Sequence, residues 1–329
     1  QPRCGNLCKW PATIPNASLD GGDCLMSDRD LIGYADQPPD IVWPNGARLA
    51  VSVVVNFEEG AEIQVGDGDP TSERVGEVLS VVPEGRRDQG QEQIFAYGTR
   101  VGLWRFLKAL KDTQTPATFY MCGRAVERSP QLARAIVEAG HEAACHGWLW
   151  RPNADFPDAH TERVDLKRAT DAIQTATGQR PLGFFCRGSE SDWSREILAD
   201  TGYVYTSNAF DDDLPYLDES GLIVVPSSLA TNDMKLFHPN GFTRSGEFVE
   251  YIRDAAVQLL AEAKSGKSST LSIGLHLRIT GRPARFRAVT EILEYLASLE
   301  GQIWRARRID IARHFAAVLP VATTSLIQQ

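Results

Sequence analysis

One stretch of the chain constrains the fold more than any other: Val51-Ser52-Val53-Val54-Val55-Asn56-Phe57, followed at once by Glu58, Glu59 and Gly60. Its nearly unbroken β-branched run predicts a strand buried on both faces, as the central strands of parallel sheets are. Carboxylates at the carboxyl end of such a strand lie where α/β proteins build their sites. Strand alternation would send Glu58 and Glu59 to opposite sides unless the strand has already ended. The alternative is a solvated turn, because charged side chains are usually exposed.

Composition limits the class of protein. The 329 residues are 43% hydrophobic and 23% charged, which is ordinary for a globular protein with a core. The formal net charge of −9 argues against nucleic acid and against an anionic membrane as partners, since both require a basic face. No apolar run approaches the ~20 residues that span a bilayer. We therefore expect neither a nucleic-acid partner nor a membrane segment.

The first 27 residues form the least regular part of the sequence. Cys4, Cys8 and Cys24 lie there among prolines, glycines and asparagines, together with the glycosylation acceptor sequence Asn16-Ala17-Ser18. These features favour a secreted or extracytoplasmic protein whose leader cysteines form disulfides, with a cytoplasmic location as the alternative. We predict an irregular, cysteine-containing N-terminal arm over residues 1–27 and one domain over residues 28–329.

Beyond residue 97 the chain alternates between short apolar runs and amphipathic stretches. We predict strands at 116–121, 141–145, 182–186, 203–206, 222–226, 270–275 and 303–306, and helices at 97–113, 129–140, 161–177, 246–264, 285–297 and 309–315. Repeated strand–helix units predict a parallel sheet with right-handed crossovers. About seven such units without a break in composition fit one barrel-like α/β domain better than two open sheets. The glycine-rich segment 60–97 is longer than ordinary connections, which predicts a lid or a subunit-contact arm.

Polar residues gather at the predicted strand ends. If the strands close into a barrel, these residues converge on one mouth, as barrel active sites do. They supply a carboxylate base, imidazoles for acid or metal chemistry, and guanidiniums that bind a planar carbonyl or carboxylate. Cys145 is interpreted as a buried strand cysteine rather than a nucleophile. The strand-end set consists of Glu58, Glu59, Cys122, His146, Arg187, His276 and Arg278.

Three stretches resemble motifs of the polysaccharide deacetylase superfamily, which implies a distorted (β/α) barrel of the deacetylase type. Asn56-Phe57-Glu58-Glu59-Gly60 resembles the first motif, whose acidic pair supplies the base and one metal ligand. Cys145-His146-Gly147-Trp148-Leu149-Trp150 resembles the second motif, and Leu275-His276-Leu277-Arg278 the late histidine motif. A closer resemblance, from Asp28 to near Phe315, is to the bacterial allantoinases and the related cyclic imide and ureide hydrolases. It also includes Trp43-Pro44-Asn45-Gly46, Tyr97-Gly98-Thr99-Arg100 and Asn232-Asp233-Met234.

The resemblance also bears on cofactors. Metal-dependent deacetylases carry a second histidine four residues after the first, where this chain has Trp150. If a metal bound, Glu59 and His146 would be its ligands, one short of the three that a catalytic zinc site has, and the third is unknown. The allantoinase branch shares this loss and is described as working without a metal. No cofactor is therefore expected, with one divalent metal such as zinc as the alternative. Leu149 and Cys186-Arg187-Gly188-Ser189 depart from that branch, which leaves the substrate open.

The resemblance implies a hydrolase of non-peptide C–N bonds that acts on a small cyclic ureide, imide or amide, such as allantoin. Glu58 or Glu59 would activate water, and Arg278, His276 or a backbone N–H would stabilise the oxyanion. His276 would protonate the leaving nitrogen. One alternative is a metal-dependent N-deacetylase of acetylated sugars, and another is a non-hydrolytic ligand-binding or biosynthetic descendant. A homo-oligomer, a tetramer in that branch, is also implied. The candidate site residues are Glu58, Glu59, His146 and His276 for catalysis, and Arg187, Arg278, Arg282, Trp150 and Asp233 for substrate binding.

Overall fold

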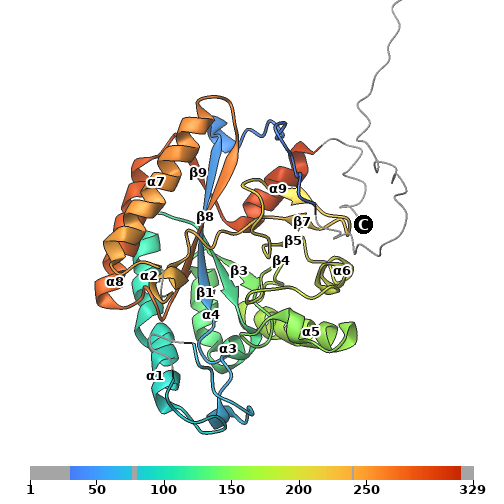
Figure 1. Ribbon diagram of the computed structural model, residues 1–329, viewed down its shortest axis with the longest axis vertical. Coiled ribbons are helices and arrows are strands. Elements are labelled where there is room, and N and C mark those ends of the chain that lie inside the picture. The colour runs from blue at the N-terminus through green and yellow to red at the C-terminus, as the bar shows by residue number, and fades with distance from the viewer. Residues whose placement is uncertain (1–29, 76–79, 239–240, 320–329) are drawn as a thin grey trace, which may run out of the picture. The chain divides into compact units, whose positions relative to one another are not determined.

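A computed structural model describes residues 30–75, 80–238 and 241–319 (Figure 1). The leader cysteines, the glycosylation acceptor sequence and the predicted boundary after residue 27 lie outside these ranges. The chain divides into two compact units, Gln1–Ala35 and Asp36–Gln329. In the described part of the first unit, Asp30 Oδ1 accepts the backbone N–H groups of Ile32 and Gly33, which forms a short turn. All other elements belong to the second unit.

The apolar run identified in the sequence forms strand β1, Leu49–Phe57, and all nine of its residues are buried. One edge of β1 pairs in parallel with β8, Ser269–His276, from Leu49↔Ser269 to Asn56↔His276. The other edge pairs with β9, Ile303–Arg305, near its start and with β2, Ala117–Met121, near its end. With both edges paired and both faces covered, β1 is the central strand, as predicted.

The sheet continues from β2 through short strands in the order β2-β3-β4-β5-β7-β6. All of these pairings are parallel except that of β6 with β7, which is antiparallel. The curled sheet with helices outside it confirms the predicted deacetylase-type distorted barrel. The short strands are β3 Glu142–Cys145, β4 Gly183–Phe184, β5 Tyr205–Thr206, β6 Tyr216–Leu217 and β7 Ile223–Val224.

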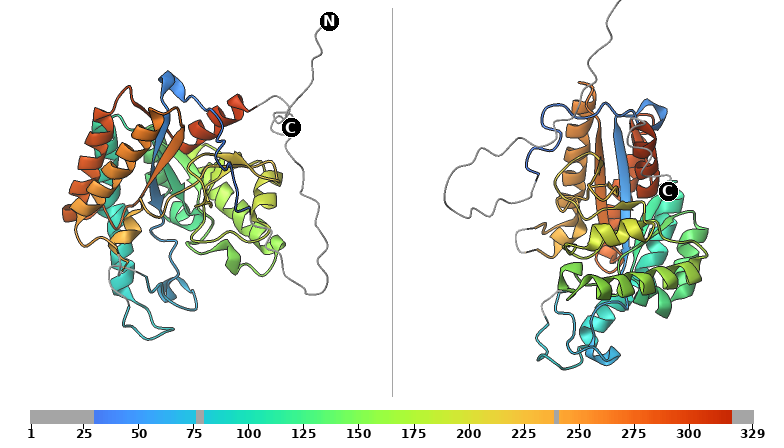
Figure 2. Two further views of the ribbon diagram at one scale, coloured as in Figure 1. Left: turned by 45° about the horizontal axis from the view of Figure 1, so that its top comes forward. Right: turned by 90° about the vertical axis from the view of Figure 1, so that its right-hand side faces the viewer.

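Helices cover the sheet, with α7 and α8 packed together beside β8 and with α3 and α4 against α5 (Figures 1 and 2). Within the described ranges, no helix combines the length and apolar character needed to cross a membrane. The helices are α1 Gln89–Tyr97, α2 Leu103–Asp112, α3 Gly123–Arg128, α4 Pro130–Glu138, α5 Ala159–Thr177, α6 Ser194–Asp200, α7 Ser245–Ala263, α8 Pro283–Ser298 and α9 Arg308–Val318.

Two predicted features differ in detail. The segment predicted as one long connection to residue 97 ends earlier, because α1 begins at Gln89, where Asp88 accepts the N–H of Gln91 at 3.0 Å as an N-terminal cap. The helix predicted at 129–140 forms as α4, Pro130–Glu138, and the Ser129 hydroxyl before it donates to the Ala125 carbonyl at 2.7 Å and does not cap the helix. Both differences are local choices of hydrogen-bond partner.

The barrel closes between β7 and β8 through a narrow set of contacts, which we call the seam. One isolated bridge joins Asn232 to Gly274, and the N–H of Gly274 donates to the Thr231 carbonyl at 3.0 Å. Arg308 is fully buried and donates across the seam to the carbonyls of Val225 and Pro226, at 2.7 and 2.9 Å, and to the Ser272 hydroxyl on β8. Side-chain hydrogen bonds therefore connect the segment after β7 to β8, where a continuous strand ladder would otherwise do so.

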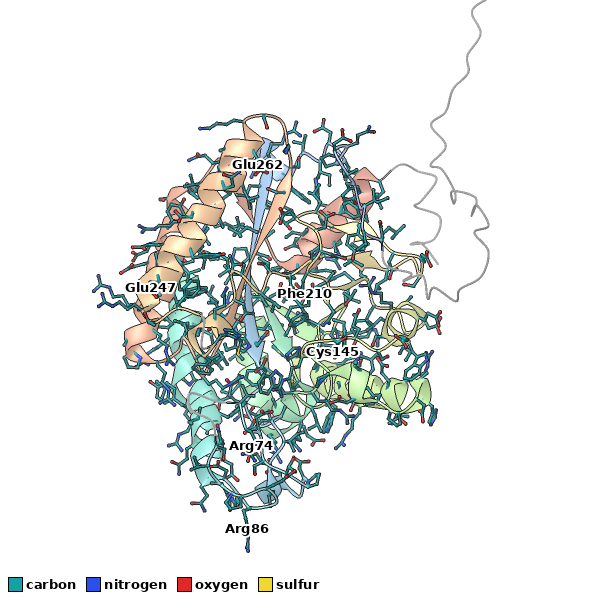
Figure 3. The ribbon with its side chains drawn as sticks, in the orientation of Figure 1. Arg74, Arg86, Cys145, Phe210, Glu247 and Glu262 are labelled. Carbon is teal, nitrogen blue, oxygen red and sulfur yellow. The ribbon has the colours of Figure 1, made fainter. Side chains whose placement is uncertain are left out.

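The three cysteines of the barrel are free, buried thiols. Figure 3 shows Cys145 in the interior, whereas the labelled Arg74 and Arg86 lie on the loop that follows β1. Burial raises the pKa of the Cys145 thiol to about 12, so the nucleophilic thiolate is scarce. Desolvation likewise raises the pKa of Cys122 and of Cys186. These thiols are core residues, as interpreted from the sequence for Cys145.

Candidate active site

Glu58 and Glu59 both lie in the interior because β1 ends at Phe57, before strand alternation could separate them. The chain then turns, with Gly60 at φ 97° and the N–H of Ala61 donating to the Glu58 carbonyl at 2.8 Å. The positive φ favours glycine at this position. Glu58 is 0% exposed and Glu59 is 4% exposed. Neither carboxylate therefore belongs to the solvated turn that was the alternative interpretation.

Glu58 is surrounded by cationic or potentially cationic side chains. Its Oε1 lies 3.2 Å from His146 Nε2 and 3.4 Å from His276 Nε2, and its Oε2 accepts from Arg278 at 2.5 Å. Burial opposes ionisation, but Arg278, His276 and His146 together hold the pKa of Glu58 well below its usual value. Glu58 is therefore a fixed anion that joins the ends of β1, β3 and β8.

His276 is held by a second carboxylate, Asp233, on the opposite side of the ring. Asp233 Oδ1 lies 2.6 Å from His276 Nδ1, while its Oδ2 accepts the His276 backbone N–H at 2.9 Å and the Thr280 hydroxyl at 2.7 Å. Burial acts to lower the pKa of His276, but Glu58 and Asp233 outweigh it and raise that pKa to about 9. His276 is consequently an imidazolium at neutral pH.

Glu59 has a different environment from its neighbour. Its Oε2 accepts the Glu58 backbone N–H at 3.1 Å, whereas its Oε1 lies 4.0 Å from Arg278 and has no hydrogen-bond partner. Burial, only partly offset by Arg278 and reinforced by the Glu58 charge, raises the pKa of Glu59 to about 8. Adjacent glutamates thus differ in role, since Glu58 is ionised and Glu59 is able to exchange a proton near neutral pH.

Glu62 is a third buried carboxyl group at this end of β1, and the sequence analysis did not assign it to the site. It is 4% exposed, and its Oε2 accepts the Gly60 N–H at 2.7 Å. Burial raises the pKa of Glu62 to about 7. Its spacing from Glu58, four residues along an irregular turn, gave no periodic signal that could have identified it.

Aromatic rings enclose the Arg278 guanidinium. Its central carbon lies 4.3 Å from the ring centre of Phe95 and 4.6 Å from that of Trp150. Planar stacking of this kind desolvates a guanidinium while leaving its N–H groups free to donate. The structure thus brings together Trp150 and Arg278, both predicted to bind substrate, with Arg278 beside Glu58 and Glu59. Phe95, on α1, was not identified from the sequence because the start of α1 was missed.

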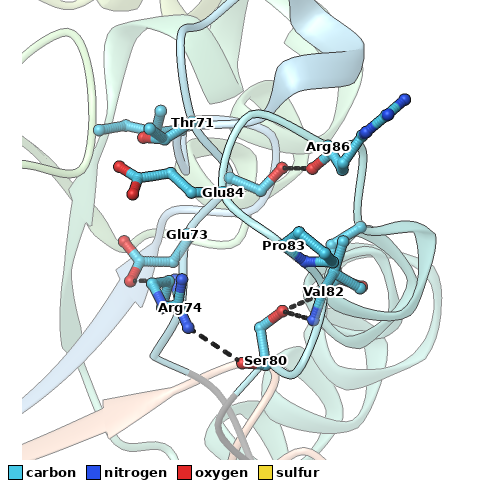
Figure 4. Close-up of a pocket in the computed structure, with 11 residues that line it drawn as sticks. Thr71, Glu73, Arg74, Ser80, Val82, Pro83, Glu84 and Arg86 are labelled. Carbon is cyan, nitrogen blue, oxygen red and sulfur yellow. Dashed lines mark hydrogen bonds between the residues drawn. The ribbon is translucent and has the colours of Figure 1, made fainter.

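Two predicted substrate-binding arginines make other contacts. Arg187 donates to Glu73 at 2.6 Å and stacks 3.8 Å from the Trp150 ring centre. Arg282 stacks 3.8 Å from the Tyr97 ring centre. Glu73 also lines a surface cavity of about 270 Å³ in the loop after β1, where Arg74 donates to the Ser80 carbonyl at 3.3 Å (Figure 4). Arg187 thus forms its ion pair with this loop and not with Glu58 or Glu59.

The donor set does not fit a divalent metal. No group of three or more histidine, cysteine, aspartate or glutamate side chains is arranged to hold an ion in the described ranges. His146 Nε2 faces Glu58, not its predicted co-ligand Glu59, while Nδ1 faces the Phe185 carbonyl. Both ring nitrogens thus face acceptors, whereas metal binding needs a free lone pair. The Arg278 guanidinium already provides a positive charge beside Glu58 and Glu59.

Within the part of the chain that the structure describes, three buried polar atoms around this cluster have no hydrogen-bond partner: Glu59 Oε1, Asn56 Oδ1 and Arg278 Nε. The amide of Asn56 uses its other end, Nδ2, against His276 Nε2 at 2.8 Å. The charged His276 ring carries a proton on Nε2 and therefore needs an acceptor at that position. If the Asn56 amide is turned over, Oδ1 accepts from Nε2 and Nδ2 is left without a partner. In either orientation, one end of the Asn56 amide remains available. Asn56 is a polar residue near the end of the apolar run that forms β1, and this is the feature of the sequence that could have identified it as a site residue.

Several known proteins are similar to this chain over most of its length. The polysaccharide deacetylase family profile matches residues 92–206. A Schizosaccharomyces pombe protein assigned to the polysaccharide deacetylases is 34% identical over 319 residues, covering 90% of this chain and 99% of the relative.

Two solved structures are also similar to this chain. A PuuE allantoinase shares 39% identity with a TM-score of 0.84, and a Pseudomonas aeruginosa protein assigned to the polysaccharide deacetylases shares 38% identity with the same TM-score. Each alignment covers 89% of this chain and 99% of the other. The agreement extends over nearly the whole length of each of these proteins, and the resemblance of the motifs to both groups is confirmed. The chain belongs to the polysaccharide deacetylase family.

Proposed function

We propose that the protein hydrolyses a non-peptide C–N bond in a small cyclic ureide, imide or amide, without requiring a metal. The family and the allantoinase neighbour support a C–N hydrolase as the general class. The observation that carries the finer proposal is the set of unpartnered buried atoms, which offers an acceptor at Glu59 and a donor at Arg278. A ureide or imide ring presents N–H donors and carbonyl acceptors close together and satisfies both kinds of atom.

Glu59 is the proposed general base. With a pKa of about 8, roughly a tenth of it is ionised at pH 7, and its ionised form is a stronger base than an ordinary carboxylate. It takes a proton from water as the water oxygen attacks the substrate carbonyl carbon. Glu58 is too firmly stabilised as an anion to serve as this base, and instead orients His146, His276 and Arg278.

His276 and Arg278 are the proposed partners of the developing oxyanion and the leaving group. Both are cationic and buried, so their attraction for a negative oxygen is little screened by water. The tetrahedral intermediate then expels nitrogen as the C–N bond breaks, and His276 gives that nitrogen its proton. Asp233 stabilises the charged ring beforehand and keeps Nδ1 occupied, so that Nε2 is the nitrogen directed toward the site.

The test is a hydrolysis assay with allantoin, a hydantoin and a cyclic imide, run before and after treatment with a chelator. We expect ring opening of at least one compound, unchanged by chelation and lowered by about 100-fold or more in Glu59→Gln. The conservative surface substitution Glu247→Gln, on the exposed N-terminal turn of α7, serves as the control. Turnover that disappears on chelation and returns with zinc would contradict the metal-independent proposal.

A second candidate is N-deacetylation of acetylated sugars, which the family assignment favours. The donor set opposes it, because His146 Nε2 faces Glu58 and not the predicted co-ligand Glu59, and no metal-binding cluster of three such side chains occurs among the described residues. Release of acetate from chitin oligomers in the presence of added zinc, with no ring opening of cyclic compounds, would favour this alternative. Absence of acetate release under those conditions would remove it.

A further inference from the structure

A single turn of π-helix separates α1 from α2, and a glycine stands at each of its ends. This turn, Gly98–Gly102, is continuous with both helices. Turns of this kind are rare and are found frequently at functional sites. Both glycines are buried, and each faces one of the two segments that carry the candidate active site. Neither glycine was assigned a role from the sequence.

Gly98 faces the side chain of Glu59. A Cβ atom at position 98 would lie 2.3 Å from Glu59 Oε1, 2.6 Å from Cδ and 2.8 Å from Cγ. Contacts this short do not persist between non-bonded heavy atoms, so the end of the Glu59 side chain would have to move by about 1 Å. The obstacle is the mobile end of a side chain and not the backbone. A larger residue at this position would therefore displace the carboxyl group without unfolding the helix.

Gly102 faces the other catalytic segment, and there the contact is with backbone. A Cβ atom at position 102 would lie 2.3 Å from the carbonyl oxygen of Leu277, the residue between His276 and Arg278. Arg105, one turn further on, donates to the Gly281 carbonyl and to the Tyr97 hydroxyl, at 2.7 Å each. The π-helical turn is thereby attached to the segment after β8 while it contacts Glu59 through Gly98.

We propose that Gly98 is a positioning residue of the active site: its missing side chain leaves the slot in which the Glu59 carboxyl group lies beside Arg278. Gly102 and Arg105 fix that slot relative to the segment that carries His276 and Arg278. The proposal rests on the proposed function only in giving Glu59 a part in proton transfer. The steric conflict between a side chain at position 98 and the Glu59 side chain does not depend on which substrate the protein binds.

The catalytic arm of the test compares Gly98→Ala with the wild type under hydrolysis conditions. A displacement of about 1 Å lowers turnover by up to roughly 100-fold, so we expect kcat to fall on that scale while KM changes little. The matched control is Gly246→Ala, in the first turn of α7, where a Cβ atom would meet nothing within 4 Å. Gly102→Ala, which meets backbone, should instead lower the melting temperature. Unchanged kcat in Gly98→Ala overturns the proposal.

A second arm needs no activity. Alanine forms helices better than glycine, so Gly98→Ala should raise the melting temperature when nothing obstructs it. We expect that rise in a Glu59→Ala background, where the obstructing carboxyl group is absent, and a smaller rise or a fall in the wild-type background. Equal effects in the two backgrounds would show that the residues are not coupled and would overturn the proposal. If the wild type hydrolyses none of the compounds, the proposed function fails while this comparison still decides the role of Gly98.

Discussion

Replacing Glu59 with glutamine should make the protein more stable, and by an amount that depends on pH. The wild-type carboxyl group ionises near pH 4.5 when unfolded but only near pH 8 when folded, because burial disfavours the charge. Between those values the native state holds a proton that the unfolded state has lost. The free energy of unfolding of the wild type therefore falls as pH rises through this window. Glutamine has nearly the same shape and no proton to lose.

The size of the effect follows from the width of the window. A difference of about 3.5 pKa units at about 1.4 kcal/mol per unit gives roughly 5 kcal/mol, fully expressed above pH 8 and absent below pH 4.5. The group is 4% exposed, so solvent screening reduces this figure little. Five kcal/mol is comparable with the whole stability of many domains, and the difference should therefore be readily measured.

Urea unfolding at several pH values between 5 and 9 measures this difference directly. The advantage of Glu59→Gln over the wild type should grow steadily with pH and level off above 8. Glu62→Gln is the matched comparison, with a smaller gain of about 3 kcal/mol that levels off above pH 7. An advantage of Glu59→Gln that is constant across the range would mean that Glu59 ionises normally in the native state, and the assignment of the base would fall with it.

Three further outcomes are expected. The pH profile of kcat/KM should rise through about pH 8 as Glu59 ionises and fall above about pH 9 as His276 loses its proton. Asp233→Asn should move the falling limb to lower pH, and a limb that does not move would contradict the pairing of Asp233 with His276. Arg278→Lys, which loses planar stacking, should lower kcat by about 100-fold in steady-state assays while the melting temperature reports its folding; full activity would exclude Arg278 from the oxyanion site. Arg308→Met should destabilise by about 3 kcal/mol in urea titrations because two buried carbonyls lose their donor, and a neutral effect would show that water replaces it.

The central strand and the strand-end residues could be predicted from the sequence because each rests on a strong local signal. The β-branched run before Glu58 favours a buried strand, His146 follows the short buried strand β3, and His276 ends the buried strand β8. In a parallel sheet the carboxyl ends of the strands lie at the same edge, so residues at those ends are expected to lie close together. This is why the sequence alone predicts Glu58 and Arg278, 220 residues apart in the chain, to lie in one site.

Other features depend on pairings that no local pattern encodes. Arg187 follows its strand as predicted, yet its partner is Glu73, from a loop whose polar sequence has no period. The environments of Glu58 and Glu59 differ because only Glu58 contacts Arg278 directly. The Arg278 guanidinium lies 2.5 Å from the Glu58 carboxylate and 4.0 Å from that of Glu59. Adjacent identical residues cannot be told apart by residue type. Only the packed structure assigns the proton to one of them.

The seam between β7 and β8 carries one residue of the candidate active site on the least continuous part of the barrel. Asp233 follows directly from the bridge residue Asn232, so one of the two carboxylates that raise the pKa of His276 is carried by the seam itself. A local opening there would leave β1, β2, β3, Glu58 and Glu59 in place but would release Asp233. Amide hydrogen exchange at Gly274 measures the free energy of that opening. A molecule opened at the seam would therefore keep most of its strands while His276 loses one of its two carboxylate partners.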